Sequence, residues 1–271
     1  MTGICDLHTH STASDGQYTP AELAALVKKR GAEVWALTDH DTADGVREAM
    51  AAGSELGLRV VSGIELSARE YHTFHILGYG FDPYAPELSA LCGRMKTGRD
   101  ERSLRLLAYL AEHGMALTLE EVEAIAGGEV VGRPHFAQAM VRHGYVANNR
   151  EAFDKWLDTE EFHARVERQK PSARECVETI KAAGGKVSLA HPYQIGVDDG
   201  ALEDIVRELV GYGLDAIECH YPKFTPEQES YYLHLAEKYR LHVTGGSDFH
   251  GERVKPDVSL AAIPLELDWL I

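Results

Sequence analysis

The chain has few cysteines and no long apolar run. Its four cysteines, Cys5, Cys92, Cys176 and Cys219, form no Cys-x-x-Cys pair in 271 residues. We therefore expect reduced, mostly buried thiols in a cytoplasmic protein, not a disulfide framework or a thiolate metal site. No apolar stretch reaches the roughly 18 residues that a membrane span needs. The amino terminus enters an expected strand almost at once, which leaves no room for a signal peptide.

Three common catalytic and nucleotide-binding motifs are also missing. The sequence contains no Walker loop, no Gly-x-Gly-x-x-Gly fingerprint and no Gly-x-Ser-x-Gly elbow. These absences argue against P-loop, dinucleotide-binding and α/β-hydrolase chemistry. Ser247 stands beside Asp248 and near His250, but a turn so rich in metal-ligand types is a poor setting for a serine nucleophile.

Positive charge is scarce. The chain carries 27 Lys and Arg residues against 43 Asp and Glu residues, a formal net charge of −16. Such a chain repels polyanions at long range, so we expect neither duplex DNA nor a membrane among its partners. Residues 94–170 are nearly balanced, with 12 basic and 13 acidic side chains. This middle segment is therefore the part least repulsive to an anion.

Apolar runs that end in His, Asp or Glu recur along the chain. The first run leads into His8-Thr9-His10, and because strand side chains alternate, His8 and His10 face the same way. The later runs end at Asp39-His40-Asp41, Glu65, His191, Glu218-Cys219-His220 and Asp248-Phe249-His250. In a barrel of parallel strands the carboxyl ends meet at one face, where the chemistry lies. The pattern predicts such a barrel, with a site built from these residues.

Strand and helix patterns alternate outside the middle of the chain. We expect strands at 34–38, 60–64, 74–80, 186–190, 215–219 and 241–246, a closing strand at 260–265, and helices at 20–30, 43–56, 172–183, 201–212 and 226–239. Only nine residues separate Glu65 from His75, too few for a crossover helix. The expected strand at 74–80, with His75 near its start, therefore returns toward the site from the opposite direction.

Strand patterns disappear between residues 94 and 167. Helical patterns replace them at 99–113, 118–126, 133–143 and 150–157. We interpret this segment as an all-helical insertion, which divides the chain into 1–93, 94–167 and 168–271. We expect the insertion to form a wall or lid over the site; a stability cap is the alternative.

The candidate ligands are His and carboxylate residues, without thiolates. This composition suits Mn²⁺, Fe²⁺ or Zn²⁺ in a hydrolytic centre better than a structural zinc site. Several carboxylates among several His residues allow one carboxylate to bridge two metals. Two or three such ions can generate hydroxide near neutral pH and stabilise a leaving oxygen.

The ordered motifs resemble those of the polymerase-and-histidinol-phosphatase (PHP) family. The resemblance rests on His8-Thr9-His10, the Asp15 loop, Thr38-Asp39-His40-Asp41, Gly63-Ile64-Glu65, Ala190-His191-Pro192 and Ser247-Asp248-Phe249-His250. It covers the whole barrel portion. It implies an α/β fold, a distorted (β/α)7 TIM-like barrel, with a di- or trinuclear metal centre and phosphoesterase activity.

The resemblance also implies a ligand set for each metal. The first metal would be held by His8, His10, Glu65 and Asp248, the second by Glu65, His75 and His191, and the third by Asp15, His40 and His250. Two or three divalent ions per chain follow, with Mn²⁺ favoured and Fe²⁺ or Zn²⁺ as alternatives. Many relatives have His where Asp15 stands, and an Asp can ligate these metals equally well.

A narrower resemblance involves Gly132-Arg133-Pro134-His135 in the insertion. It is similar to a subgroup that acts on nucleoside 3′,5′-bisphosphates and short 5′-phosphorylated RNA. Arg133 offers a planar fork for a phosphate, and His135 can donate to the same group. The alternative is that Arg133 pairs with a nearby Glu and His135 caps a helix.

The expected reaction is removal of the 3′-phosphate from a nucleoside 3′,5′-bisphosphate by a metal-bridging hydroxide. Arg133 and His135 would hold the 5′-phosphate, and His191 or His220 would protonate the leaving alkoxide. Short 5′-phosphorylated oligoribonucleotides are further candidate substrates. The alternatives are a histidinol-phosphate phosphatase, a non-catalytic module of the same fold and a metal-dependent amidohydrolase.

Other residues near the expected strand ends have open assignments. Asp39 and Asp41 are expected either to orient His40 or to cap the following helix. Tyr193, Tyr221 and Phe249 either stack on a base or pack in the core. Glu218 is either part of the site or structural.

Overall fold

The computed structural model describes residues 2–126, 131–167 and 169–271. The chain forms two compact units, one of Met1–Cys92 with Lys170–Ile271 and one of Gly93–Gln169. The insertion predicted at 94–167 falls within the second unit; residues 127–130 of it, and residue 168 after it, lie outside the described residues. Helix α3 (Pro86–Glu112) begins in the first unit and continues into the second.

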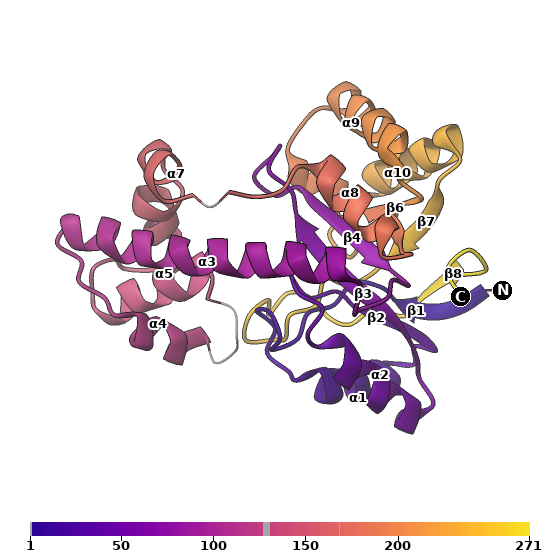
Figure 1. Ribbon diagram of the computed structural model, residues 1–271, viewed down its shortest axis with the longest axis horizontal. Helices are drawn as coiled ribbons and strands as arrows, with labels where there is room; N and C mark the ends of the chain where they lie inside the picture. The colour runs from indigo at the N-terminus through magenta and orange to yellow at the C-terminus, as the bar shows by residue number, and fades with distance from the viewer. Residues whose placement is uncertain (1, 127–130, 168) are drawn as a thin grey trace. The chain divides into compact units, whose positions relative to one another are not determined.

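The first unit contains an eight-stranded sheet, counted over the described residues, that curves into a nearly closed barrel (Figure 1). Its strands are β1 (Thr2–Asp6), β2 (Val34–Leu37), β3 (Arg59–Ser67), β4 (His75–Tyr79), β5 (Lys186–Leu189), β6 (Ala216–His220), β7 (His242–Gly245) and β8 (Ile263–Glu266). Their order in the sheet is β7-β6-β5-β4-β3-β2-β1-β8. The α/β barrel expected from the sequence is therefore confirmed.

Two strands run against the others and distort the barrel. Strand β4 is antiparallel to both of its neighbours, β3 and β5, and β8 is antiparallel to β1. The remaining pairs are parallel. The connection between Glu65 and His75 is too short for a crossover, so the chain turns back, as predicted. The amino end of β4 consequently lies with the carboxyl ends of its neighbours, which brings His75 to the same face.

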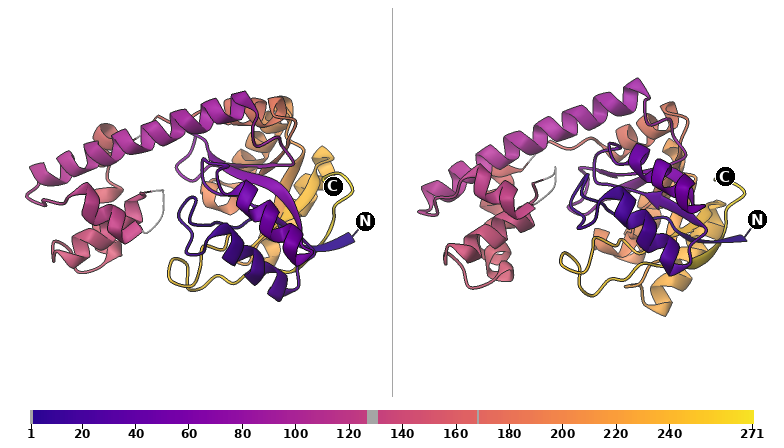
Figure 2. Two further views of the ribbon diagram at one scale, coloured as in Figure 1. Left: turned by 60° about the horizontal axis from the view of Figure 1, so that its bottom comes forward. Right: turned by 90° about the horizontal axis from the view of Figure 1, so that it is seen from below.

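The barrel closes around β1. At the carboxyl end of β1, Leu7 N donates to Gly245 O (3.2 Å), and Asp248 N donates to His8 O (2.7 Å). Strand β8 pairs along β1 from Thr2 to Cys5, as expected for the last apolar segment. The amino end of β1 and the carboxyl-terminal segment after β8 therefore lie close together, in all views of Figures 1 and 2.

Helices cover the outside of the barrel. They are α1 (Pro20–Arg30), α2 (Val46–Leu56), α8 (Ala173–Ala182), α9 (Asp199–Tyr212) and α10 (Pro226–Tyr239). A short 3₁₀ helix, η2 (Pro192–Ile195), directly follows His191. Helices α1 and α2 lie together beside β2 and β3, whereas α8, α9 and α10 lie beside β4 to β7 (Figure 1). Helix α1 begins as predicted, because Thr19 and Glu22 form a reciprocal capping box before Pro20. Helix α2 begins at Val46, later than the expected residue 43.

The second unit is helical in all of its described residues that have regular structure. Besides the end of α3 it contains α4 (Leu119–Ala126), α5 (Arg133–Arg142), α6 (Asn149–Ala152), the π-helix η1 (Phe153–Leu157) and α7 (Glu160–Val166). Its own core includes Leu106, Phe136 and Phe162. Within the described ranges, no helix combines the length and the apolar character that crossing a bilayer requires.

Candidate metal centre

The predicted ligands converge at the face where the parallel strands end. His8 and His10 follow β1, Glu65 lies in β3, His191 follows β5, and Asp248 and His250 follow β7. All six side chains are buried. His40 follows β2 and His75 opens β4, and both are half-buried. The structure therefore brings together residues that are up to 242 positions apart in the chain.

Glu65 Oε2 faces the two histidines of the first motif. It lies 3.3 Å from His8 Nε2 and 3.2 Å from His10 Nε2. Asp248 Oδ1 lies 3.3 Å from the same nitrogen of His10. Ligand atoms of these four residues all lie within 4.8 Å of one another. This is the set expected for the first metal.

The other oxygen of Glu65 faces a second pair of imidazoles. Glu65 Oε1 lies 2.8 Å from His75 Nδ1 and 2.9 Å from His191 Nε2, and these two nitrogens are 3.3 Å apart. One carboxylate thus presents its two oxygens to different histidine pairs, which is what a bridging ligand requires. His40 Nδ1 also lies 3.0 Å from Glu65 Oε2, a contact that the sequence did not predict.

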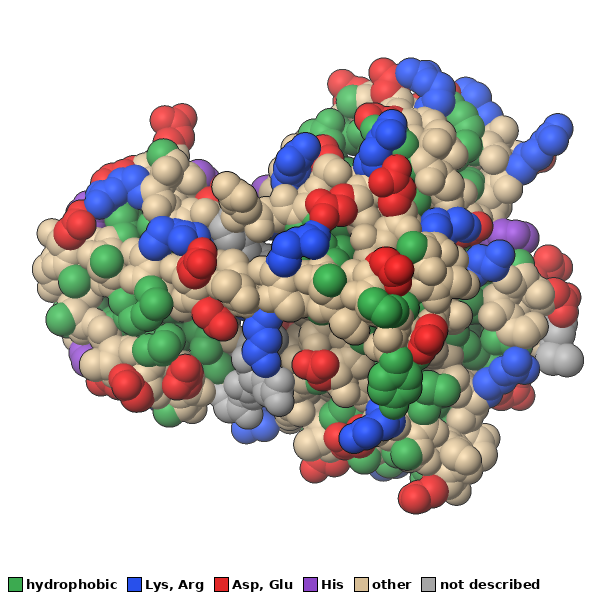
Figure 3. Space-filling model, viewed as in Figure 1, with side chains coloured by type: hydrophobic (Ala, Val, Ile, Leu, Met, Phe, Trp, Pro, Cys, Tyr) green, Lys and Arg blue, Asp and Glu red, His purple; other side chains and the backbone are tan. Residues whose placement is uncertain are grey.

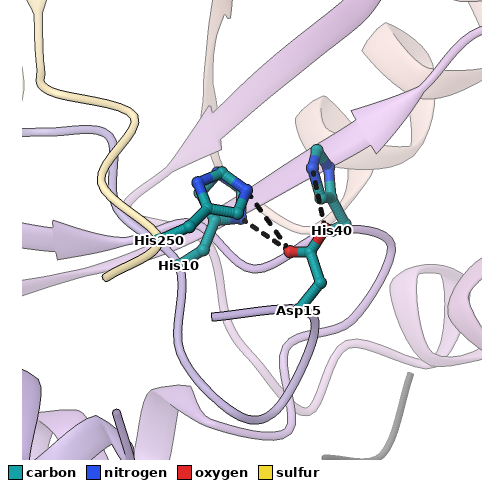
Figure 4. A group of neighbouring side chains, drawn as sticks. All are labelled: His10, Asp15, His40 and His250. Atoms are coloured by element: carbon teal, nitrogen blue, oxygen red, sulfur yellow. Dashed lines mark ion pairs between the residues drawn. The ribbon is translucent and has the colours of Figure 1, made fainter. Parts of the chain in front are cut away.

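Asp15 forms the outer part of the site with His40 and His250 (Figure 4). Its Oδ1 lies 3.4 Å from His250 Nε2, and its Oδ2 lies 4.0 Å from His40 Nε2. Figure 4 also shows His10 turned toward Asp15, with Nδ1 at 3.9 Å from Oδ1. His10 is therefore common to two groups, whereas the sequence assigned it to the first metal alone.

Several buried atoms of these groups lack a hydrogen-bond partner among the described residues. They include His8 Nε2, both ring nitrogens of His10, His40 Nδ1 and Glu65 Oε2, and His191 Nδ1 lacks a partner as well. An unpaired buried polar atom costs about 1–3 kcal/mol, so leaving the first five together is costly without a ligand. Divalent metal ions would satisfy these atoms, and the donor set fits Mn²⁺, Fe²⁺ or Zn²⁺.

Burial and neighbouring charges set the protonation of these ligands. Burial raises the pKa of Glu65, but His40 and His75 outweigh it and hold the pKa of this carboxyl well below its usual range. Burial lowers the pKa of His10 to about 4, helped by His250 and His40. The pKa of His75 is also lowered to about 4, chiefly by burial. At neutral pH the site therefore offers an anionic carboxylate and two neutral imidazoles.

Glu218 of β6 orients two of the ligands. His8 Nδ1 lies 3.1 Å from Glu218 Oε1, and Glu218 Oε2 accepts a hydrogen bond from His191 N (2.7 Å). Donation from His8 Nδ1 leaves the lone pair of Nε2 directed at the Glu65 group. The open assignment of Glu218 is thereby resolved in favour of positioning the ligands.

Asp39 holds a loop instead of a ligand ring. It accepts hydrogen bonds from Ser11 N (2.7 Å), Ser11 Oγ (2.7 Å) and Ser14 Oγ (2.6 Å), and so fixes the loop that carries Asp15. Both roles considered for Asp39, orienting His40 and capping the next helix, are therefore wrong. Asp41 accepts from Ser67 N (2.8 Å) and Ser67 Oγ (3.2 Å), which ties its loop to the end of β3.

Asp6, which was not predicted as a site residue, fixes the turn that carries Asp248. The buried carboxylate accepts from Ser247 N (2.9 Å), Ser247 Oγ (2.7 Å) and Ala261 N (2.8 Å). Its position in the sequence, as a charged residue at the end of an otherwise apolar strand, could have indicated a role in the site. The bonds matter because Asp248 (φ 55°) and His191 (φ 22°) have left-handed backbone conformations, which non-glycine residues adopt at a cost.

Two donors that the sequence did not place in the site meet at the outer oxygen of Asp248. Tyr221 Oη donates to Asp248 Oδ2 (2.9 Å), and Lys255 Nζ donates to the same atom (2.7 Å). Base stacking is one of the two roles predicted for Tyr221, and its hydroxyl is bound to Asp248 instead of being free to contact a base. Phe249 is buried and stacks on Tyr18, so it belongs to the packing.

The predicted substrate residues have local partners in the second unit. Arg133 Nη1 donates to Asp158 Oδ1 (3.0 Å) and Leu157 O (3.1 Å). His135 Nδ1 accepts from Gly132 N (3.0 Å) at the start of α5. These contacts match the alternative in which Arg133 pairs with a carboxylate, here an Asp, and His135 caps a helix. Phosphate binding by the two residues stays a prediction.

The assignment of the group that protonates the leaving oxygen also stays a prediction. His191 Nε2 faces Glu65 Oε1 at 2.9 Å, as a metal ligand would. His220 Nδ1 lies 2.8 Å from Glu229 Oε1 of α10, and its side chain is partly exposed. This contact turns His220 toward the outer helix.

Comparison with known proteins identifies similar chains along most of the sequence. A family model described as PHP domain matches residues 6–184. The chain is 34% identical over 251 residues to a 5′-3′ exoribonuclease of Haemophilus influenzae, covering 92% of this chain and 91% of that protein. It is also 34% identical over 247 residues to a 3′,5′-nucleoside bisphosphate phosphatase of Chromobacterium violaceum, covering 90% and 86%. A phosphoribosyl 1,2-cyclic phosphate 1,2-diphosphodiesterase of Eggerthella lenta is 34% identical over 253 residues, covering 92% and 95%.

Solved structures are similar over nearly the whole chain. A Chromobacterium violaceum structure, named as an amidohydrolase with bound sulfate and no metal, has a TM-score of 0.84 and 31% identity, covering 97% of this chain and 92% of that one. A Bifidobacterium adolescentis structure, named as a candidate metal-dependent phosphoesterase, has a TM-score of 0.82 and 31% identity, covering 97% and 93%.

Proposed function

Because the chain belongs to the PHP family, we propose that it is a metal-dependent phosphatase that removes the 3′-phosphate of nucleoside 3′,5′-bisphosphates. The coarser activity, hydrolysis of a phosphoester, is common to the names of the three relatives. The observation that carries the proposal is Glu65, a buried carboxylate whose two oxygens face separate histidine pairs. The bisphosphate substrate is supported by the Chromobacterium violaceum relative and by the Arg133 motif.

The described residues prepare the site for an anionic substrate and a charged transition state. Divalent ions bound by the three ligand groups would supply a hydroxide nucleophile near neutral pH and neutralise charge on the phosphoryl oxygens. Glu65 and Asp248 supply the anionic ligands, and Glu218 holds the ring of His8 so that Nε2 points inward. Burial of these groups excludes water and strengthens their electrostatic interactions.

A second candidate reaction is removal of nucleotides from the 5′ end of short 5′-phosphorylated RNA. The observation that favours it is the similarity to the Haemophilus influenzae exoribonuclease. Both reactions would use one 5′-phosphate as a recognition group and hydrolyse a neighbouring phosphoester. The net charge of −16 makes local recognition of this phosphate necessary.

Substrate truncation tests the proposal. We expect Mn²⁺-loaded protein to convert adenosine 3′,5′-bisphosphate to 5′-AMP, and to hydrolyse adenosine 3′-monophosphate and histidinol phosphate less efficiently. Arg133→Ala should raise KM for the bisphosphate by about tenfold or more, since a charged hydrogen bond is lost, and should leave kcat/KM for the 3′-monophosphate unchanged. The proposal fails if histidinol phosphate is the better substrate. An equal effect of Arg133→Ala on both nucleotides removes its assigned role.

A further inference from the structure

The loop after the last ligands places a lysine at the edge of the metal centre. Lys255 Nζ lies 2.7 Å from Asp248 Oδ2, while Oδ1 of the same carboxylate faces His10 Nε2 (3.3 Å) and His250 Nδ1 (3.4 Å). The ammonium is thus separated from the candidate metal positions by one carboxyl group. The side chain of Lys255 is 32% exposed and that of Asp248 is 3% exposed. The ammonium therefore lies where the buried ligands meet solvent.

We propose that Lys255 binds the phosphoryl group that is hydrolysed, as a cation next to the metal centre; the inference rests on the phosphoesterase function proposed above. An ammonium has three N–H donors. Among the described residues, Asp248 Oδ2 is the one hydrogen-bond acceptor found for it. The remaining N–H groups are available to the oxygens of an incoming phosphate.

Asp248 does not depend on Lys255 alone for its orientation. Tyr221 Oη donates to the same oxygen, at 2.9 Å, and Tyr221 is 7% exposed. The backbone of Asp248 is held separately, by donation from its N–H to His8 O (2.7 Å). Asp248 is therefore held in position without Lys255. The charge and solvent exposure of Lys255 are not needed to orient this carboxylate.

The loop that carries Lys255 is held in place by its neighbours. Lys255 N donates to Gly251 O (2.9 Å), and Arg253 N donates to Gln17 Oε1 (2.9 Å). Gln17 N in turn donates to His250 O (2.7 Å), which joins the loop to a ligand residue. A cation held in position before the substrate arrives loses little freedom on binding.

The overall charge of the chain makes a local cation important for binding a phosphate. Figure 3 shows Lys and Arg side chains interspersed with Asp and Glu side chains over the described residues of the face in view. With a formal net charge of −16, long-range attraction of a phosphate is not available to this chain. Attraction must come from groups at the site, and Lys255 adds a fixed positive charge to that of bound metal ions.

Binding of inorganic phosphate to the metal-loaded protein tests the inference without relying on turnover. Lys255→Met should weaken phosphate binding about tenfold or more, measured by calorimetry at saturating Mn²⁺, since a charged hydrogen bond is lost. Lys255→Arg should lose less, because it keeps the charge. Tyr221→Phe removes the other donor to Asp248 Oδ2, so it measures what weaker positioning of Asp248 costs, and its loss of phosphate affinity should be smaller than that of Lys255→Met. Lys186→Met, at an exposed lysine of β5, is the matched control and should leave phosphate affinity unchanged. Metal content should be equal in all variants.

Two results would overturn the inference. The first is unchanged phosphate affinity in Lys255→Met. The second is an equal loss of phosphate affinity or metal in Lys255→Met and Tyr221→Phe, which would assign Lys255 to holding Asp248. Failure of the proposed function is distinguishable, since it would appear as poor hydrolysis of adenosine 3′,5′-bisphosphate by protein whose phosphate binding still depends on Lys255.

Discussion

At the scale of single residues, metal binding depends on which polar atoms of each candidate ligand are already engaged by neighbours and which remain to contact a metal. Glu65 is fully buried, and its two oxygens lie within 3.3 Å of five imidazole nitrogens. Each ring must present a neutral nitrogen to a metal, which fixes where its other proton goes. The partners of the ligands therefore influence metal affinity nearly as much as the ligands themselves.

Glu218→Gln tests this dependence. The substitution keeps the shape of the side chain but replaces the negative acceptor for His8 Nδ1, so His8 is a weaker ligand. We expect Mn²⁺ affinity to fall about 10- to 100-fold, as is typical for loss of such partners. Calorimetric titration of metal-free protein measures it. Glu229→Gln, at the contact with His220, is the control; equal effects of the two would refute the positioning role of Glu218.

Metal binding should release protons. Burial acts to lower the pKa of His40, but Glu65 and Asp15 outweigh it and raise the pKa to about 9. At pH 7 the metal-free ring is therefore protonated and must lose this proton to ligate a metal, so affinity should fall as the pH falls below 9. Titration with Mn²⁺ in two buffers of different ionisation enthalpy measures the release. His40→Gln should release about one proton fewer, and the exposed His234→Gln should match the unsubstituted protein.

Residues next to the ligands were the hardest to predict. The candidate ligands could be predicted because His, Asp and Glu residues rarely follow several apolar strands of one chain by chance. Lys255 and Asp6 were missed, because a single charged residue near a turn is common and only the closed barrel brings β1, β7 and the following loop together. The contacts of Asp39 depend on loop geometry that has no periodic pattern.

At the scale of elements, the site is built where strands end, and close strand contacts leave no room for extra atoms. Gly246, directly after β7, lies against His8, which follows β1. A Cβ on Gly246 would come within 2.4 Å of His8 Cβ and 2.5 Å of His8 N. The approach that lets Asp248 N reach His8 O therefore requires glycine at this position.

Gly246→Ala should consequently destabilise the protein and displace His8. We expect the free energy of unfolding to fall by about 1–3 kcal/mol, as for other overpacked positions, and Mn²⁺ affinity to fall with it. Urea unfolding of the metal-free protein measures the first effect. Gly93→Ala is the matched control: it lies in helix α3 with no atom within 4 Å of the added Cβ, and should stabilise by about 0.5–1 kcal/mol. An unchanged free energy of unfolding in Gly246→Ala would contradict the close packing of Gly246 on His8.

Element types were predictable because hydrophobic periodicity and capping residues agreed. The antiparallel β4 followed from the short connection alone. Helix α3 was predicted at 99–113 but spans Pro86–Glu112, because Gly93 and Gly98 interrupt a pattern that the buried Leu88, Leu91 and Met95 continue. Tertiary packing outweighs the poor helix propensity of these glycines.

At the scale of the whole molecule, we propose that the two units have different functions, metal binding in one and substrate recognition in the other. The barrel carries the candidate metal ligands, and the helical unit carries Arg133, which lies over the ring of the core residue Phe162. The division could be recognised from the disappearance of strand patterns after residue 93. The role of the helical unit could not, since Arg133 has the carboxylate partner that a purely structural arginine would also have.

The most direct test of the account is phosphate release from adenosine 3′,5′-bisphosphate as metal-free protein is titrated with Mn²⁺. We predict no release without metal, a rate that rises until two or three ions are bound per chain, and 5′-AMP as the product. Glu65→Gln should abolish the rise. Release that persists in excess chelator, or no release from protein shown to hold its full complement of metal, would contradict the conclusion that the residues around Glu65 form a hydrolytic metal centre.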